Sequence, residues 1–251
     1  MKTIDLRYQV TIFGNFDDVT PTSENLKFFI DEFYDKNLIP NQFTEVSVEL
    51  RNKETKNIES TRLRLSDMEN RWDIRFLSDK LVITFLNSNI GVVKMITKEE
   101  FLKEINNILL SLDKKFSKTY KRIGFVTQYL TSGFENLKTI NAFSKIPTFF
   151  DSKPIVDWSN SLATRMKIEE KNLYDEIVNA SYDLKMVSQI MKIENKIANF
   201  NGAILNIDIN TIDENQNYRL KKEIIENILN KFLEIEDNVK NQIFEKFVNN
   251  N

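Results

Sequence analysis

The feature that most constrains the fold of this 251-residue chain is a repeated change in the spacing of its apolar residues. Apolar residues alternate with polar ones along residues 3–13, whereas they recur every three or four positions along residues 218–248. Alternation favours a half-buried β-strand, and the longer spacing favours a helix with one buried side. A chain that mixes both patterns must bury sheet faces against helices, which predicts an α+β fold.

The predicted elements of the first half follow the order β-α-ββββ-α-β. A strand at 3–13 precedes a helix that opens at Pro21-Thr22-Ser23. Thr97 and Glu100 form a capping box at the start of the second helix, and a strand at 120–130 follows it. The turn-rich stretches between the four middle strands predict an antiparallel meander. Those strands are expected at 43–51, 60–65, 71–77 and 80–86.

The second half is predicted to follow the order ββββ-α, which gives two antiparallel sheet-and-helix halves. The halves span residues 1–131 and 159–251, and residues 132–158 form a connecting segment with Gly133, Pro147 and Pro154. Four strands are expected at 161–168, 174–184, 186–193 and 203–209, the third of which also fits a helix. A closing helix at 218–248 completes the chain.

The apolar stripe of the closing helix is longer than a sheet of ordinary strands can cover. About 30 residues make a helix of roughly 45 Å, against strands of roughly 20 Å. Part of this helix is therefore expected to extend beyond the second sheet and to contact the first half or another subunit. Val239, Ile243 and Phe247 are the predicted partner interface at its end. The stripe consists of Leu220, Ile224, Ile228, Phe232, Ile235, Val239 and Ile243.

The chain contains no cysteine and no histidine, which removes most familiar catalytic and metal-binding chemistry. Disulfides, thiol nucleophiles, zinc sites with Cys or His ligands and Ser–His–Asp triads are excluded. The glycine-rich phosphate-binding motifs are also absent. We predict no catalytic residue, no cofactor and no bound metal. An oxygen-ligated metal-dependent hydrolase stays open as an alternative, because Asp17, Asp18 and Asp208 follow or end strands.

Charge and hydropathy limit the kinds of partner and the cellular locations that are expected for this chain. The 35 basic and 37 acidic residues leave a net charge of −2, so a nucleic-acid surface would have to be a local patch. The N-terminal residues Met-Lys-Thr-Ile-Asp-Leu-Arg-Tyr are interrupted by charges, which argues against a signal peptide. No run of about 18 apolar residues occurs, so no membrane contact is expected. The cytoplasm is the predicted location.

A set of arginines is the strongest candidate for a binding surface. Alternation within the predicted strands places Arg62 and Arg64 on one face, and it places Arg71 and Arg75 on one face of the next strand. Four guanidinium groups on aligned faces would suit phosphates or carboxylates. The competing interpretation is a solvated sheet face with cross-strand ion pairs. The acidic partners would then be Glu45, Glu49 or Asp73.

Three short segments follow one another in a recognisable order. They are Tyr120-Lys121-Arg122-Ile123-Gly124-Phe125, Ala203-Ile204-Leu205-Asn206-Ile207-Asp208-Ile209 and Asn241-Gln242-Ile243-Phe244-Glu245. They resemble an Arg-Ile-Gly strand, an Asp-containing apolar strand and a long C-terminal helix of a sporadically distributed family of uncharacterised prokaryotic proteins. Where that family usually has an Arg-Tyr pair, this chain has Val126-Thr127-Gln128-Tyr129. The resemblance supplies no functional residues, and its patchy distribution implies an anti-phage defence or mobile-element locus.

These observations predict a non-enzymatic interaction or regulatory protein whose partner is another protein or a second copy of the chain. Two alternatives stay open. The first is a nucleic-acid-binding protein that uses the arginine-lined sheet face. The second is the oxygen-ligated metal-dependent hydrolase.

Overall fold

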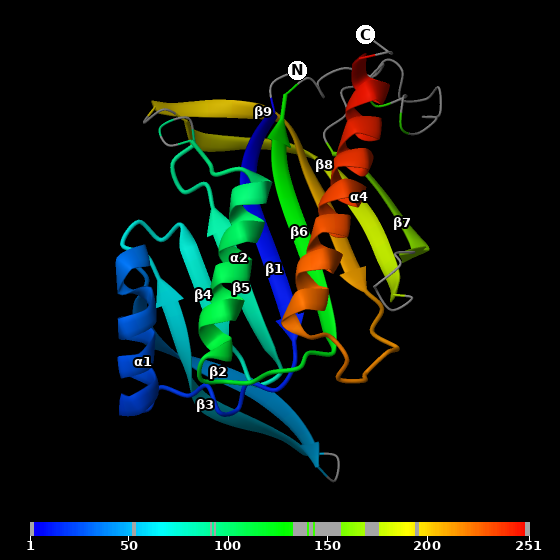
Figure 1. Ribbon diagram of the computed structural model, residues 1–251. Helices are drawn as coiled ribbons and strands as arrows, with labels where there is room; N and C mark the ends of the chain where they lie inside the picture. The colour runs from blue at the N-terminus through cyan, green and yellow to red at the C-terminus, as the bar shows by residue number, and fades with distance from the viewer. Residues whose placement is uncertain are drawn as a thin grey trace.

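A single nine-stranded antiparallel sheet forms the body of the described structure, and the helices α1, α2 and α4 cover one of its faces (Figure 1). The strand order is β2-β3-β4-β5-β1-β6-β9-β8-β7. The computed structural model describes residues 3–51, 54–90, 92, 94–132, 140, 143, 157–168, 176–193 and 196–248, excluding the side chains of 49–51, 54–56, 189–193, 196, 198, 247 and 248. The predicted α+β class is confirmed.

The first half contains the elements that the sequence predicts, in the predicted order. Its helices are α1 (Ser23–Phe33), which a short 3₁₀ turn at Tyr34–Lys36 extends, and α2 (Lys98–Asp113). Thr97 and Glu100 form the expected capping box. The strands are β1 (Thr3–Phe13), β2 (Ile39–Arg51), β3 (Glu54–Ser66), β4 (Trp72–Phe76), β5 (Lys80–Leu86) and β6 (Arg122–Thr131).

The second half differs from the prediction in one respect. The strands expected at 174–184 and 186–193 form one continuous strand, so this half has three strands and a helix. Lys185, the residue between them, keeps its place in the ladder opposite Ile204, and no turn residue interrupts the strand. The elements are β7 (Ser159–Ile168), β8 (Glu176–Ile193), β9 (Lys196–Thr211) and α4 (Lys222–Val248).

The two halves share one sheet. Strand β6 of the first half pairs with β1 on one side and with β9 of the second half on the other. Of the predicted connecting segment, the structure describes only residues 132, 140, 143, 157 and 158. Buried side chains of both halves form one continuous core between the sheet and the helices.

The closing helix α4 spans both halves, as its length predicts. It packs on β9 and β6 and lies beside α2 of the first half. Phe232, Ile228 and Ile243 of its apolar stripe are buried. The predicted contact of this helix with the first half is therefore confirmed.

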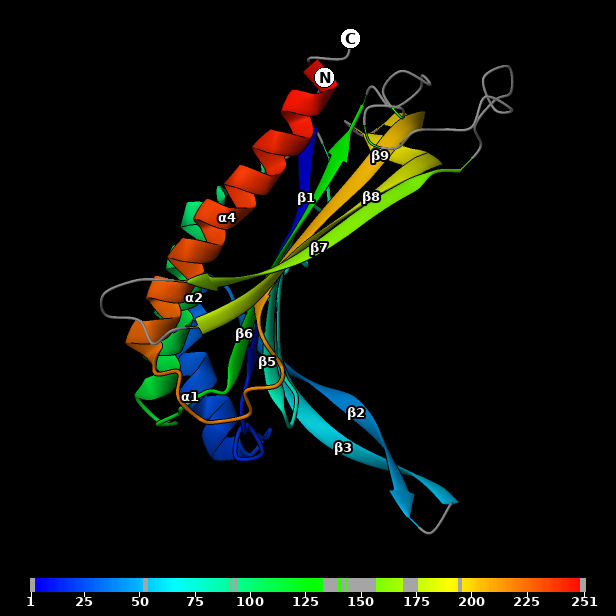
Figure 2. The ribbon, with the colours of Figure 1, turned by 90° about the vertical axis from the view of Figure 1, so that its right-hand side faces the viewer.

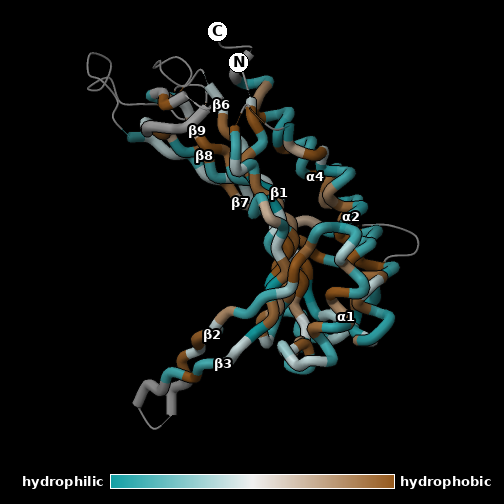
Figure 3. Tube along the Cα trace, turned by 90° about the vertical axis from the view of Figure 1, so that its left-hand side faces the viewer, coloured by the Kyte–Doolittle hydropathy of each residue, from teal (hydrophilic) through white to brown (hydrophobic). Residues whose placement is uncertain are grey.

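Two ribbons extend beyond the body of the sheet, both toward the side without helices (Figures 2 and 3). One is the outer part of β2 and β3, because β3 pairs with β4 only at Arg64, Leu65 and Ser66. The other is the outer part of β8 and β9, because β7 pairs with β8 only as far as Lys185. The face between the two ribbons is called the open face below.

Candidate functional site

Side chains on the open face form rows that cross the sheet, because neighbouring strands pair in register. Residues that alternate with the buried core positions point to this face. One row has two arginines near one end and a third at the other end. It runs through Asn41, Arg64, Arg75, Val82, Thr11, Gly124, Asn210, Asn179 and Arg165.

The two neighbouring rows are rich in amides and hydroxyls. Gln128 Nε2 donates to Asn206 Oδ1 at 2.8 Å, and Asn210 Nδ2 donates to Asp208 Oδ1 at 3.2 Å. The floor of the open face is therefore polar, with hydrogen-bonding groups on adjacent strands. The first of these rows is Asp73, Thr84, Gln9, Val126, Asp208, Ser181 and Ala163, and the second is Leu86, Arg7, Gln128, Asn206, Asp183 and Ser161.

Charge is distributed unequally between the two sides of the sheet. Among the described side chains of the open face, nine are cationic and four are acidic. The helices of the other side contain thirteen acidic and seven basic residues. The chain is nearly neutral, yet its open face is basic and its helical layer is acidic. The cations are Arg7, Arg62, Arg64, Arg75, Lys80, Arg122, Arg165, Lys167 and Lys185, and the acids are Glu45, Asp73, Asp183 and Asp208.

Arg62 lies on the open face but is buried in an ion-paired position. Its guanidinium donates to Glu45 Oε2 at 2.7 Å and to Asp17 Oδ1 at 3.1 Å. Burial acts to lower the pKa of Arg62, but its hydrogen bonds to Glu45 and Asp17 raise it above the ordinary value. This arginine is neutralised by its two carboxylate partners.

Arg64 and Arg75 share a single carboxylate on the open face. Arg64 Nε donates to Asp73 Oδ1 at 2.7 Å, and Arg75 Nη2 lies 2.6 Å from Asp73 Oδ2. These are cross-strand ion pairs of the kind that the competing interpretation expects, with Glu45 and Asp73 as the acids. Two guanidiniums and one carboxylate leave this group with a net positive charge.

Arg71 does not join the other three arginines. Strand β4 begins at Trp72, and the backbone N–H groups of Arg71 and Trp72 donate to Asp67 Oδ1 in the preceding turn. The Arg71 guanidinium lies 4.7 Å from the centre of the Phe85 ring, whose side chain belongs to the buried core under the helices. The alternation of side chains along β4 therefore does not place the Arg71 guanidinium on the open face.

Two arginines outside the predicted set of four lie on the central strands β1 and β6 of the open face. The Nε atoms of Arg7 and Arg122 are buried and donate to no acceptor within the described part of the chain. The Arg122 guanidinium lies 4.6 Å from the centre of the Phe13 ring. Arg122 belongs to the Arg-Ile-Gly strand and stands opposite Phe13, whereas Arg7 stands opposite Gln128. The two arginines therefore share one face of the β1–β6 pair but are separated by about 20 Å along the strands.

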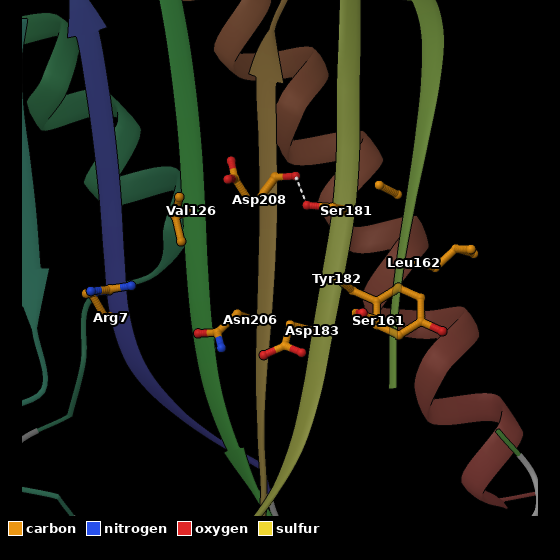
Figure 4. Close-up of a pocket in the computed structure, with 10 residues that line it drawn as sticks. Arg7, Val126, Ser161, Leu162, Ser181, Tyr182, Asp183, Asn206 and Asp208 are labelled. Atoms are coloured by element: carbon orange, nitrogen blue, oxygen red, sulfur yellow. Dashed lines mark hydrogen bonds between the residues drawn. The ribbon is translucent and has the colours of Figure 1, made fainter. Parts of the chain in front are cut away.

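Arg7 stands at one side of a shallow trough in the open face (Figure 4). The trough encloses about 510 Å³, and β1, β6, β9, β8 and β7 contribute to its lining. Asn206, Asp208 and Asp183 face it from β9 and β8. The trough therefore offers one guanidinium, an amide and two carboxylates to a ligand.

Two of the three residues predicted as a partner interface on α4 pack toward strands β7 and β8 of the same chain. Ile243 is buried, and Val239 is half-buried. Both line a cavity of about 210 Å³ between α4 and strands β7 and β8, together with Leu162 and Tyr182. The side chain of Phe247 lies outside the described residues.

A second charged cluster lies under the sheet, between α2, α4 and β6. Glu236 is fully buried and accepts hydrogen bonds from Thr127 Oγ1 at 2.9 Å, from Tyr129 OH at 2.5 Å and from Lys98 Nζ. Lys98 also donates to Asp237 Oδ1 at 2.5 Å. None of these side chains lines the trough, and their bonds tie α4 to α2 and the sheet.

The acids considered for a metal site are dispersed. Asp17 pairs with Arg62 and Asp18 with Lys118, whereas Asp208 lies in the trough. Within the described ranges, no three acidic side chains converge as metal ligands. Across the same ranges, no helix has both the length and the apolar content needed to cross a bilayer. Comparison with known proteins finds no family model and no curated protein that matches the chain.

Proposed function

We propose that this protein binds nucleic acid on the open face of its sheet. The separation of charge between the two sides of the sheet is the main support for this proposal. Even with Arg62 neutralised by Glu45 and Asp17, the eight other cations outnumber the three other acids of the open face, and the described helices on the opposite side are acidic. Lysine and arginine that neutralise phosphates provide most of the sequence-independent affinity for nucleic acid. The overall charge of −2 does not oppose such binding when the charges are segregated.

The chemistry of the open face also fits a phosphate backbone. The half-buried side chains of Arg7 and Arg122 form no ion pair with a described carboxylate, and a phosphate oxygen is a natural acceptor for the outer nitrogens of a guanidinium. The amides of Gln128, Asn206 and Asn210 lie between the cationic positions. Side-chain amides and hydroxyls commonly contact phosphate and sugar in such interfaces.

A non-enzymatic role in binding a protein partner is the second candidate function. The observation that favours it is a pair of exposed valines on the β2–β3 ribbon. Val46 is 57% exposed and Val48 is 63% exposed, on the same face of that ribbon. Apolar side chains grouped on a projecting element are typical of protein interfaces. The link to an anti-phage defence or mobile-element locus belongs with this candidate.

The proposal is tested by fluorescence anisotropy with labelled DNA and RNA at several salt concentrations. Arg7→Gln/Arg122→Gln removes two cations from the open face, whereas the matched control Lys27→Gln/Lys103→Gln removes two exposed cations from the helices. For duplex DNA, each lost phosphate contact should reduce the slope of log affinity against log salt by about 0.9. The control should bind like the unmodified protein. Absence of binding at low salt, or equal loss in both variants, would contradict the proposal.

A further inference from the structure

We infer that the nucleic acid is double-stranded and lies across the open face between the two ribbons. This inference rests on the proposed function and concerns its substrate class. Three features of the open face support this inference. They are the lack of aromatic side chains at its centre, the distance over which its cations are spread, and the form of the β2–β3 ribbon.

The central part of the open face lacks a surface on which unpaired bases could stack. Sheets and grooves that bind single strands commonly present aromatic side chains to the bases. Along the described parts of β5, β1, β6 and the body of β9, the open face presents a single aromatic residue, Phe13. Its ring is near Arg122 at 4.6 Å and Lys80 at 6.0 Å. Phe43 and Phe200 have the same orientation but lie on the two ribbons, and Tyr182 lines the edge of the trough. Bases of a single strand would thus meet amides, hydroxyls and aliphatic groups.

The cations are spread over a width that suits two phosphate backbones. Arg75 on β4 and Arg165 on β7 lie toward the two ends of the same row, separated by six strand spacings. At about 4.8 Å each, these spacings cover roughly 29 Å along the sheet. Arg7 and Arg122 lie between these ends on β1 and β6. The single phosphate backbone of an extended strand would follow one line across the sheet, so most of the cations off that line would have no phosphate partner.

The β2–β3 ribbon provides an element that fits a groove. The major groove of a B-form duplex admits a two-stranded β-ribbon, and a single strand has no such groove. The outer part of this ribbon pairs with no other described strand, and Val46, Ser47 and Val48 are exposed. A two-stranded ribbon is marginally stable by itself in water, so it gains stability when it packs on a partner.

The experiment compares the affinities of duplex DNA of about two helical turns and of each of its separate strands. The variant is a shortened ribbon in which Asn-Gly replaces residues 46–59. Glu45 and Ser60 are register partners, so a two-residue turn can join them and the Arg62–Glu45 ion pair is kept. The unmodified protein should bind the duplex about tenfold or more tightly than either strand. Shortening should weaken duplex binding and leave the weaker single-strand binding unchanged.

Other outcomes separate this inference from the proposed function. Equal or tighter binding of a single strand overturns the inference and leaves the proposed function standing. Duplex affinity that ribbon shortening does not change overturns the inference as well. If neither form of DNA binds at low salt, the proposed function itself fails. Should the shortened protein not fold, Ser47→Glu/Ile58→Glu places repulsive charges at two exposed register partners on the open-face side of the ribbon and must weaken duplex binding selectively.

Discussion

Arg64 lies directly opposite Arg75 in the β3–β4 ladder, and both guanidiniums bond to the same carboxylate, Asp73. Like charges on directly opposite residues repel each other, so the shared carboxylate stabilises this arrangement. It also reduces the positive charge that the pair can offer to a phosphate. Asp73 therefore affects stability and binding in opposite directions.

Asp73→Asn should strengthen nucleic-acid binding while weakening the fold. Removal of one carboxylate raises the charge of the open face, so affinity at low salt should rise by about threefold to tenfold and the gain should fade as salt increases. Loss of two charge-assisted bonds should lower the free energy of unfolding by about 1–3 kcal/mol. Anisotropy titrations and urea denaturation measure the two effects. Asp31→Asn, which removes an exposed acid from α1, should change neither by a comparable amount.

Phe232→Ala should destabilise the protein strongly, because this side chain is fully buried between α4 and the rest of the core. Truncation of a buried phenylalanine costs about 3–5 kcal/mol through lost apolar contacts and the cavity left behind. Urea denaturation measures the change in the free energy of unfolding. Tyr34→Ala is the control, since that side chain is 75% exposed. An unchanged denaturation midpoint for Phe232→Ala would contradict this account of α4.

Glu236→Gln should also destabilise the fold, by about 3–5 kcal/mol, because Lys98 would stay buried with only Asp237 as a nearby acid. Replacement of both members, in Lys98→Met/Glu236→Met, should recover part of this loss by removing the buried charges together. A double-mutant cycle measured by urea denaturation gives the coupling between the two residues. Additive single effects would show that the pair does not act as a unit.

The pH dependence should include a loss of stability in alkaline solution. Burial raises the pKa of Tyr8, Tyr120 and Tyr129 above their ordinary value, and the carboxylates of Asp5 and Glu236 add to the effect at Tyr8 and Tyr129. The folded protein keeps these phenols neutral, whereas the unfolded chain ionises them near pH 10. Their contribution is therefore complete below about pH 10 and is lost as pH rises further.

A spectrophotometric titration of tyrosinate checks this expectation. In denaturant, all seven tyrosines should ionise near their ordinary pKa. In the folded protein, Tyr8, Tyr120 and Tyr129 should ionise only as near-ultraviolet circular dichroism reports unfolding. Complete ionisation of all seven before any loss of the folded signal would show that these phenols are accessible.

Much of the fold could be predicted from the sequence, because helix caps and amphipathic stripes depend on residues that are close together in the chain. The Thr97–Glu100 capping box and the apolar stripe through Phe232 form in the structure at the expected positions. The break expected near Lys185 was wrong because strand continuity there depends on pairing with β9, not on a local turn signal. The predicted alignment of Arg71 with Arg75 is absent because Asp67 holds the backbone before β4 begins.

The candidate site was predicted less completely, because its residues come from strands distant in the chain. Arg7 and Arg122 are more than a hundred positions apart in the chain, and only the pairing of β1 with β6 places them on the same sheet face. The bulge between Asp5 and Arg7 further changes the alternation, since Asp5 stands opposite Tyr129 of the core. Total charge likewise gives no information about which side of a sheet each charge occupies.

The basic open face and the acidic helical layer give the molecule an electric dipole that runs perpendicular to the sheet. In the field of a polyanion, such a dipole experiences a torque before any contact forms. The protein should therefore rotate its open face toward the polyanion as it approaches, and a larger share of collisions should begin in a productive orientation. Because salt screens this torque, the association rate should fall as salt increases even at a fixed number of final contacts.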